Sequence, residues 1–227
     1  MKMIYLGQAG FLLECGGLRI VIDPYLSDSV GAMDAAKHRR VPADPSFFDV
    51  RPDVLIFTHG HPDHYDPATA EEYLRRHDEI TVLAPSTVWG IVRQQGKAHN
   101  YVLFDRGTRW TEGAVRFTAV PAAHSDAAAV GIVVQAEGKT LYFTGDTLYH
   151  EGIFPHLPDG IDLVFLPVNG MGNNMNAADA ADFAARCGAK WAVPMHTGLL
   201  DDLSAEIYTA NNRILPEIYK ELNWEGA

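Results

Sequence analysis

The sequence of 227 residues lacks any long apolar run without charge, which excludes a membrane-spanning helix. Its longest candidate, residues 127–136, is about half the length of the roughly 18–20 residues that such a helix needs. The N-terminal residues 1–13 carry one lysine and are otherwise uncharged, but no small-residue cleavage site follows them, so they do not predict a secretory signal. We therefore expect a cytoplasmic protein with no membrane partner.

Cysteine and positive charge are also scarce. The two cysteines, Cys15 and Cys187, lie far apart and form no metal-binding pair, which favours reduced thiols in a reducing compartment. Lysine and arginine number 18 against 29 aspartates and glutamates, giving a formal net charge of −11. Because affinity for nucleic acid depends largely on Lys and Arg neutralising phosphates, this charge disfavours a nucleic-acid partner. A small-molecule substrate is the expected partner instead.

No internal repeat, low-complexity tract or flexible linker divides the chain, so we expect a single domain over residues 1–227. Apolar residues make up 47% and charged residues 21%, as in ordinary globular proteins. A first β-hairpin is expected over residues 3–22, turned by Gly16-Gly17. Further strand-like runs rich in Val, Ile, Leu and Phe cover residues 54–58, 81–84, 101–104, 115–120, 130–135, 140–144, 163–167 and 191–194.

Four segments have helical patterns, at residues 67–77, 85–95, 177–187 and 204–222. In the last of these, Ser204 is followed by Ile207, Ile214 and Leu215, which predicts an amphipathic helix packed on the body or on a second subunit of a homo-oligomer. Residues 24–52 show little periodicity and predict a long surface loop, and such loops in compact domains are often functional.

One short segment concentrates metal-ligating side chains. It directly follows the apolar run 54–57 and reads Thr58-His59-Gly60-His61-Pro62-Asp63-His64. Three imidazoles and a carboxylate within six residues fit neither a helical face nor a strand alternation, but one loop can turn several of them toward a single point. Neutral imidazole and carboxylate are ligands of borderline divalent ions such as Zn²⁺. A single histidine would more often be a surface or core residue, but this combination predicts a metal site.

Three more candidates follow strand-like sequence at separate places in the chain. They are His124 after the run 115–120, Asp146 after 140–144, and His196 after 191–194. Each alone is more often a cap or turn residue. Sheet proteins nevertheless often carry functional residues at strand ends. Because all three residues lie at such positions and follow the histidine-rich loop in this order, together they indicate further metal ligands.

This order resembles the metallo-β-lactamase fold superfamily, and the resemblance spans nearly the whole chain. Within the superfamily the sequence looks most like the branch of L-ascorbate 6-phosphate lactonase and related metal-dependent hydrolases. The closer match lies in Leu6-Gly7-Gln8-Ala9-Gly10-Phe11, Ile22-Asp23-Pro24-Tyr25-Leu26-Ser27-Asp28, and Leu166-Pro167-Val168-Asn169-Gly170 running into Asn174-Met175-Asn176. The chain departs from the lactonase at residues 170–173, where the lactonase has a longer, Arg-containing insertion.

The resemblance implies an α+β fold, a four-layer αββα sandwich with metals in a cleft at one edge of the two sheets. It implies that His59, His61 and His124 hold one divalent ion, that Asp63, His64 and His196 hold a second, and that Asp146 bridges them. Zinc or manganese is expected, with iron as the alternative.

Such a site predicts a hydrolase, because the pKa of metal-bound water can fall to about 7. We expect it to cleave a small ester, lactone or phosphoester, and among these classes a lactone is the favoured substrate. Asp63 or Asp146 is expected to carry a proton to the leaving group, and the spacing leaves open which of them does so.

Other polar residues are candidates for supporting roles. Asp23, with Thr58 and Thr147, is expected to hold the ligands in place, against the simpler reading of a strand-end cap. Asn169, Asn174 and Asn176 are expected to face substrate, with turn and cap roles as the alternative.

Three other functions stay open. They are a phosphodiesterase or nuclease of the same fold, a di-iron redox protein, and a metal-binding module without catalysis.

Overall fold

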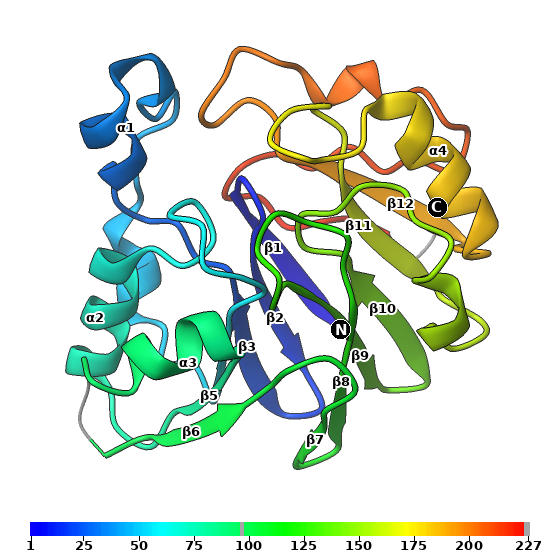
Figure 1. The fold of residues 1–227 in the computed structure, drawn as a ribbon. Coiled ribbons are helices and arrows are strands. Elements are labelled where there is room, and N and C mark those ends of the chain that lie inside the picture. Colours follow the sequence, from blue (N-terminus) through cyan, green and yellow to red (C-terminus); the bar gives the residue numbers. More distant parts are fainter. Residues whose placement is uncertain (96–97, 225–227) are drawn as a thin grey trace.

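Two six-stranded β-sheets lie face to face in the structure, a computed structural model that describes residues 1–95 and 98–224 (Figure 1). The first sheet has its strands in sequence order: β1 (Lys2–Gly7), β2 (Gly10–Cys15), β3 (Leu18–Ile22), β4 (Val54–Ile56), β5 (Thr81–Ala84) and β6 (Asn100–Leu103). The second runs in the reverse order: β12 (Trp191–Met195), β11 (Leu163–Pro167), β10 (Lys139–Phe143), β9 (Val130–Ala136), β8 (Val115–Pro121) and β7 (Arg109–Glu112).

Four α-helices and four 3₁₀ helices are found among the described residues. The α-helices are α1 (Ser29–Met33), α2 (Pro67–Arg76), α3 (Ser86–Val92) and α4 (Ala177–Arg186). The 3₁₀ helices are η1 (Ala35–Lys37), η2 (Pro45–Asp49), η3 (Phe154–His156) and η4 (Ala205–Ile207). In the part of the chain that the structure describes, no helix has the length and apolar character needed to cross a bilayer.

Strand directions follow from the connections. Strands β1 to β3 are antiparallel and joined by tight turns, whereas β3 to β6 are parallel, with α2 and α3 in the connections from β4 to β5 and from β5 to β6. In the second sheet, β9 and β10 form a hairpin. Its turn residues Glu137 and Gly138 both have positive φ, as a type I′ turn requires.

The main hydrophobic core lies between the two sheets and takes side chains from both. At its centre Phe143 and Phe165 stack with ring centroids 4.1 Å apart, and Phe11 of the first sheet meets Phe165 at 4.7 Å. Two further clusters fill the outer faces: α2 and α3 pack on the first sheet, and α4 packs on the second. The expected four-layer αββα sandwich is thereby confirmed.

The C-terminal segment corrects the sequence-based expectation. The helix predicted at 204–222 is wrong, because only η4 is helical there and the rest consists of turns and irregular structure with isolated β-bridges. Backbone hydrogen bonds join Tyr219 to Tyr5, Leu222 to Met3, and Ile214 to Ala192. The segment thus covers β1 and β12, which are edge strands of the first and second sheets. Hydrogen bonding to these edges outweighs a weak helical pattern that Pro216 interrupts.

The other elements agree with prediction apart from small shifts. The helices expected at 67–77, 85–95 and 177–187 are α2, α3 and α4. The long loop expected at 24–52 is largely irregular and on the surface, although it contains α1, η1 and η2. The short strand β7 was not predicted, because its polar, half-exposed sequence lacks an apolar run.

We expect Phe165→Ala to lower the free energy of unfolding by roughly 3–5 kcal/mol, because it removes a fully buried ring and leaves a cavity between the sheets. Urea unfolding followed by circular dichroism measures the change. The control is Ile91→Ala, at a side chain that is 53% exposed on α3, with an expected change of about 0.5 kcal/mol or less. Equal losses in the two variants would contradict this account of the core.

Candidate metal centre

The loop after β4 carries four of the predicted ligands. His59 and His64 are fully buried, whereas His61 and Asp63 reach a partly exposed surface. A tight turn, in which the backbone N–H of His64 donates to the carbonyl of His61 at 3.0 Å, brings the four side chains to one side of the loop. The short spacing of the motif therefore produces convergence, as predicted.

The other three ligands come from strand ends in the second sheet. His124 follows β8, Asp146 follows β10, and His196 follows β12. Gly145, directly before Asp146, has a φ of +60°, and a Cβ there would lie 3.0 Å from the Cβ of Thr58. This close approach lets Asp146 reach the histidine-rich loop of the first sheet, so glycine is required at position 145.

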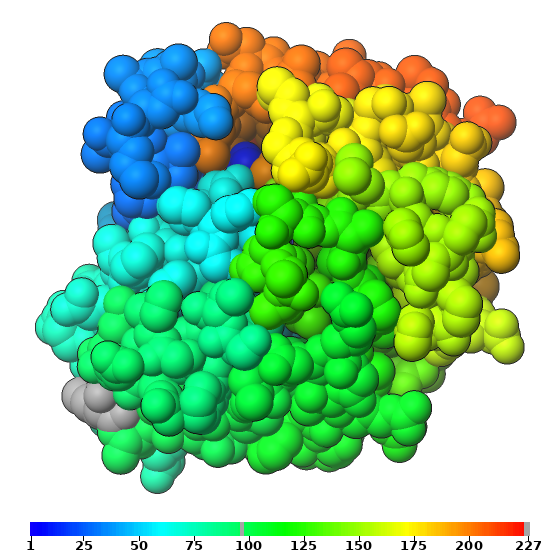
Figure 2. Space-filling model, in the orientation of Figure 1, coloured from blue at the N-terminus to red at the C-terminus, as the bar shows by residue number. Residues whose placement is uncertain are grey.

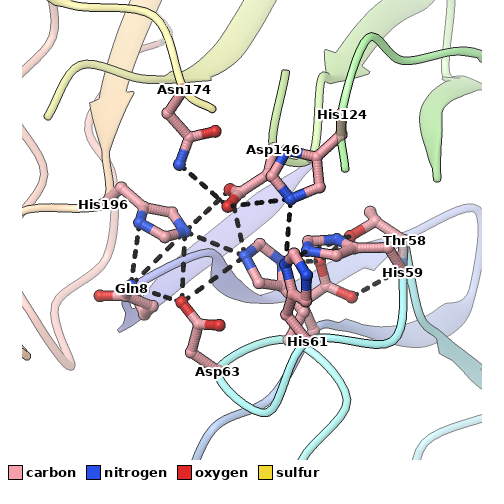
Figure 3. Close-up of polar contacts among 12 residues, drawn as sticks. Gln8, Thr58, His59, His61, Asp63, His124, Asp146, Asn174 and His196 are labelled. Atoms are coloured by element: carbon pink, nitrogen blue, oxygen red, sulfur yellow. Dashed lines mark hydrogen bonds and ion pairs between the residues drawn. The ribbon is translucent and has the colours of Figure 1, made fainter. Parts of the chain in front are cut away.

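The seven side chains gather into two groups, as Figure 3 shows. In each group the candidate ligand atoms all lie within 4.8 Å of one another: His59, His61, His124 and Asp146 form the first, and Asp63, His64 and His196 the second. Asp146 connects them, since its Oδ1 lies 2.8 Å from His196 Nε2 and its Oδ2 lies 3.9 Å from His124 Nε2. Every ligand residue predicted from the sequence is present in this cluster.

The orientation of the imidazoles is set by contacts behind them. The Nδ1 atom of His64 lies 2.7 Å from Asp23 Oδ2, that of His59 lies 3.1 Å from Thr58 Oγ1, and that of His124 lies 3.3 Å from the carbonyl of Asn173. These acceptors favour a proton on Nδ1 and leave the lone pair of Nε2 facing the cluster.

The donor atoms fit a cation between them. His61 Nδ1 lies 3.0 Å from the Nε2 atoms of both His59 and His124, and the Nε2 atoms of His64 and His196 are 2.9 Å apart. Lone pairs facing one another at such distances are unfavourable without a proton or a metal ion between them. Asp146 Oδ1 is buried and has no hydrogen bond of good geometry, despite its short distance to His196. A buried carboxylate oxygen without a hydrogen bond is stabilised by a positively charged partner.

Burial and charge act on the ionisation of the cluster in two ways. Burial lowers the pKa of His59 well below its ordinary value and also lowers that of His124, so both imidazoles are neutral. Burial opposes a charge on His64 as well, but the facing carboxylates, Asp146 foremost, outweigh it and raise the pKa. Burial disfavours the charged form of Asp146, yet His196 and His64 hold its pKa well below the ordinary range. The carboxylates therefore favour a positive charge beside them, on His64 or on a bound cation, while His59 and His124 stay neutral with lone pairs available.

Asp23 lies behind the cluster, where it contacts both His64 and Thr58. It is buried at the end of β3, where its Oδ1 accepts from the backbone N–H of Thr58 at 2.8 Å and its Oδ2 contacts His64 and the hydroxyl of Thr58. Its φ is +41°, a left-handed conformation that aspartate tolerates better than most residues. Thr147 acts nearby, because its hydroxyl accepts from the N–H of Ala123 and steadies the segment before His124.

Gln8 was not assigned a role from the sequence. Its side-chain nitrogen lies 2.8 Å from Asp63 Oδ2 and 2.9 Å from His196 Nδ1, and its carbonyl accepts from the N–H of His196 at 2.8 Å. Gln8 therefore ties together two ligands that are distant in the sequence. The available signal was an amide within the Gly7-Gln8-Ala9-Gly10 turn between two apolar strands.

Asp126 is a second residue that sequence reasoning missed. Its Oδ2 accepts from the N–H of Gly60 and from the hydroxyl of Thr87, both at 2.9 Å. The carboxylate thus joins the histidine-rich loop to α3. Its position two residues after His124 was the only sequence signal.

The predicted asparagines divide between two roles. Asn174 donates to Asp146 Oδ2 at 2.9 Å, so it holds a ligand, and it also lines the cavity above the cluster. Asn169 lines the same cavity, with its nitrogen 3.4 Å from His196 Nδ1. Asn176 caps α4 by accepting from two backbone N–H groups.

A cavity of about 650 Å³ opens over the cluster. Its floor includes His61, Asp63, Asp146 and His196, and its walls come from α1, η1, the loop 169–174 and residues 200–202. In Figure 2 the blue, yellow and orange segments border this hollow. The cluster is therefore accessible to a small molecule.

The comparisons with known proteins agree with this geometry. The sequence model described as "Beta-lactamase superfamily domain" matches residues 18–197, a range that includes all seven clustered side chains. A UPF0173 metal-dependent hydrolase of Geobacillus thermodenitrificans is 32% identical over 86% of this chain and 85% of its own. Another, from Carboxydothermus hydrogenoformans, is 27% identical over 98% of this chain and 97% of its own.

Among solved structures, Igni18, a metallo hydrolase from Ignicoccus hospitalis, superposes with a TM-score of 0.77 at 19% identity and covers 97% of each chain, which shows the shared fold. Sequence, fold and clustered ligands together place this chain in the metallo-β-lactamase fold superfamily, as a metal-dependent hydrolase.

Proposed function

We propose that this chain hydrolyses a small ester, lactone or phosphoester, with lactones as the first class, using one or two divalent ions, zinc or manganese. One observation carries the proposal. Seven side chains from both sheets turn their ligand atoms toward one another on the floor of an open cavity. The lactone preference comes from the sequence resemblance to the L-ascorbate 6-phosphate lactonase branch.

The chain's residues have distinct roles in this proposal. His59, His61 and His124 hold one ion, while Asp63, His64 and His196 hold the second, and Asp146 contacts both groups. When bound, a divalent ion makes a deprotonated water nucleophile available at neutral pH and polarises the scissile oxygen. Asn174 donates a hydrogen bond to one oxygen of Asp146, so we assign this carboxylate to holding the ions rather than to moving a proton.

Asp63 is better placed than Asp146 to carry a proton to the leaving group. Its side chain is 20% exposed and lines the cavity, whereas that of Asp146 is buried. Gln8 holds Asp63 Oδ2, and no described residue donates a hydrogen bond to Oδ1. Asp63 Oδ1 is thus free to accept a proton from the nucleophile and to return it to the departing oxygen.

The cavity suits a small substrate, since its volume of about 650 Å³ lies within the roughly 300–1,000 Å³ of typical small-molecule sites. Nucleic acid is disfavoured by the net charge of −11. Elemental analysis of the purified protein separates zinc or manganese from the iron of a redox alternative. A panel of lactones, nitrophenyl esters and bis-nitrophenyl phosphate separates the hydrolase classes.

We expect His61→Ala to lose most of the bound metal and to lower lactone or ester turnover by at least about 100-fold. His61 is partly exposed on a loop, so the variant should keep its fold and its circular dichroism spectrum. Metal content by elemental analysis, turnover and circular dichroism are measured together, and a chelator should reproduce the loss in the unmodified protein. A metal-replete, fully active His61→Ala protein would refute the ligand assignment.

We expect Asp23→Asn to weaken metal affinity by about 10- to 100-fold, because asparagine keeps the shape but removes the charge that orients His64. Asparagine also tolerates the left-handed backbone at this position. Competition with a fluorescent zinc chelator measures the affinity. The matched control is Asp53→Asn, since Asp53 binds Arg19 and Arg51 away from the cluster and should leave metal affinity unchanged.

A further inference from the structure

Two methionines are exposed at the rim of the cavity. Met33 at the end of α1 is 67% exposed, and Met171, in the loop between β11 and α4, is 51% exposed. Both line the cavity, and their segments border the hollow seen in Figure 2. Methionine is flexible and polarisable, and it recurs at surfaces that accept apolar ligands of varied shape. The exposed surface of these two side chains is therefore available for contact with such a ligand.

Other apolar residues continue this surface into the cavity. Val30 of α1 lines it together with Leu200. Val30 and Leu200 belong to one packed cluster that also contains Tyr25 and Leu199. Apolar surface therefore extends from the rim toward the ligand cluster rather than ending at isolated side chains.

The charged residues on the same wall do not favour an anion. Arg40 is paired with Asp202 at 3.0 Å, while Asp34 and Asp201 accept hydrogen bonds from nearby backbone N–H groups. Lys37 is the other cation that lines the cavity. Three carboxylates against two cations leave no excess of positive charge on this wall to select a phosphate or carboxylate on the substrate.

The part of the wall made by α1 and residues 39–40 is held in place before any ligand binds. Arg39 donates to the carbonyl of Tyr25 and to the hydroxyl of Tyr219, and the N–H of Arg40 donates to the carbonyl of Leu199. The N–H of Val30 donates to the hydroxyl of Tyr25 at 3.1 Å. An apolar surface fixed in this way binds without first paying the entropy of ordering a loop.

We infer that the site takes molecules with an uncharged apolar substituent, an alkyl chain or an aryl ring, next to the group at the metal centre. Met33 and Met171 contact this substituent and set the preference for its length. As a statement about substrates, this inference rests on the proposed hydrolysis. As a statement about binding, it is tested without turnover.

The test uses the full chain loaded with zinc and a series of straight-chain hydroxamic acids from two to eight carbons. The hydroxamate group chelates the metal, and isothermal titration calorimetry measures the Kd. We expect the Kd to fall by about two- to fourfold for each added methylene until the cavity is filled. In the double variant Met33→Gln and Met171→Gln the dependence on chain length should flatten. The control Ile91→Gln, at an equally exposed apolar side chain outside the cavity, should keep it.

Several results would overturn the inference. One is a Kd that does not change with chain length in a protein shown by elemental analysis to hold zinc, and another is a double variant with the full dependence. Tighter binding of a hydroxamate that ends in a carboxylate or phosphonate, lost in Lys37→Gln, would show that the wall selects anions instead.

A parallel assay with alkyl esters of the same lengths separates the two proposals. Binding that depends on length, without turnover of these esters or of any lactone or phosphoester in the panel above, rejects the hydrolase proposal and keeps this inference. Turnover without any dependence on length does the reverse.

Discussion

The structure depends on one electrostatic constraint: the lone pairs of five imidazoles and the oxygens of two carboxylates are held toward one another in a small, largely buried volume. His64 and His196 present nitrogens 2.9 Å apart, and Asp146 is buried beside them. Such an arrangement is unfavourable in an empty protein, since buried acceptors without donors cost free energy. Bound cations turn this unfavourable free energy into a favourable one, so metal affinity and local stability are coupled.

The fold meets this constraint with backbone conformations that are rare elsewhere. Gln8, Asp23 and His196 all adopt positive φ at strand ends or turns, and each contacts the cluster directly or through one side chain. Conformations of this kind cost about 1–3 kcal/mol each and persist only where surrounding packing holds them. The aromatic core between the sheets supplies that packing, so its rigidity is also what positions the ligands.

The sequence predicted the ligands well because their chemistry is local. The histidine-rich loop is visible in seven residues, and the strand before it is an apolar run. Gln8 and Asp126 could not be found in the same way, because their roles depend on contacts with residues far along the chain or on another element. The irregular C-terminal segment escaped prediction for a related reason: hydrogen bonds to the edge strands β1 and β12, not local propensity, determine its conformation.

The floor and the wall of the cavity come from different parts of the chain. The residues that would hold the metal ions are therefore largely different from those that would select the substrate. The floor is made of residues at strand ends whose positions follow from the sheets. The wall is made by α1, η1 and the loop before α4, which neither sheet constrains directly. Substitutions in α1 and η1 can therefore change which molecule is held without disturbing the ligands beneath them, because His64 and His59 are oriented by Asp23 and Thr58. The loop before α4 is different, since the carbonyl of Asn173 contacts His124 and Asn174 holds Asp146. A scaffold built this way keeps one reaction while its substrate range varies with a few exposed side chains.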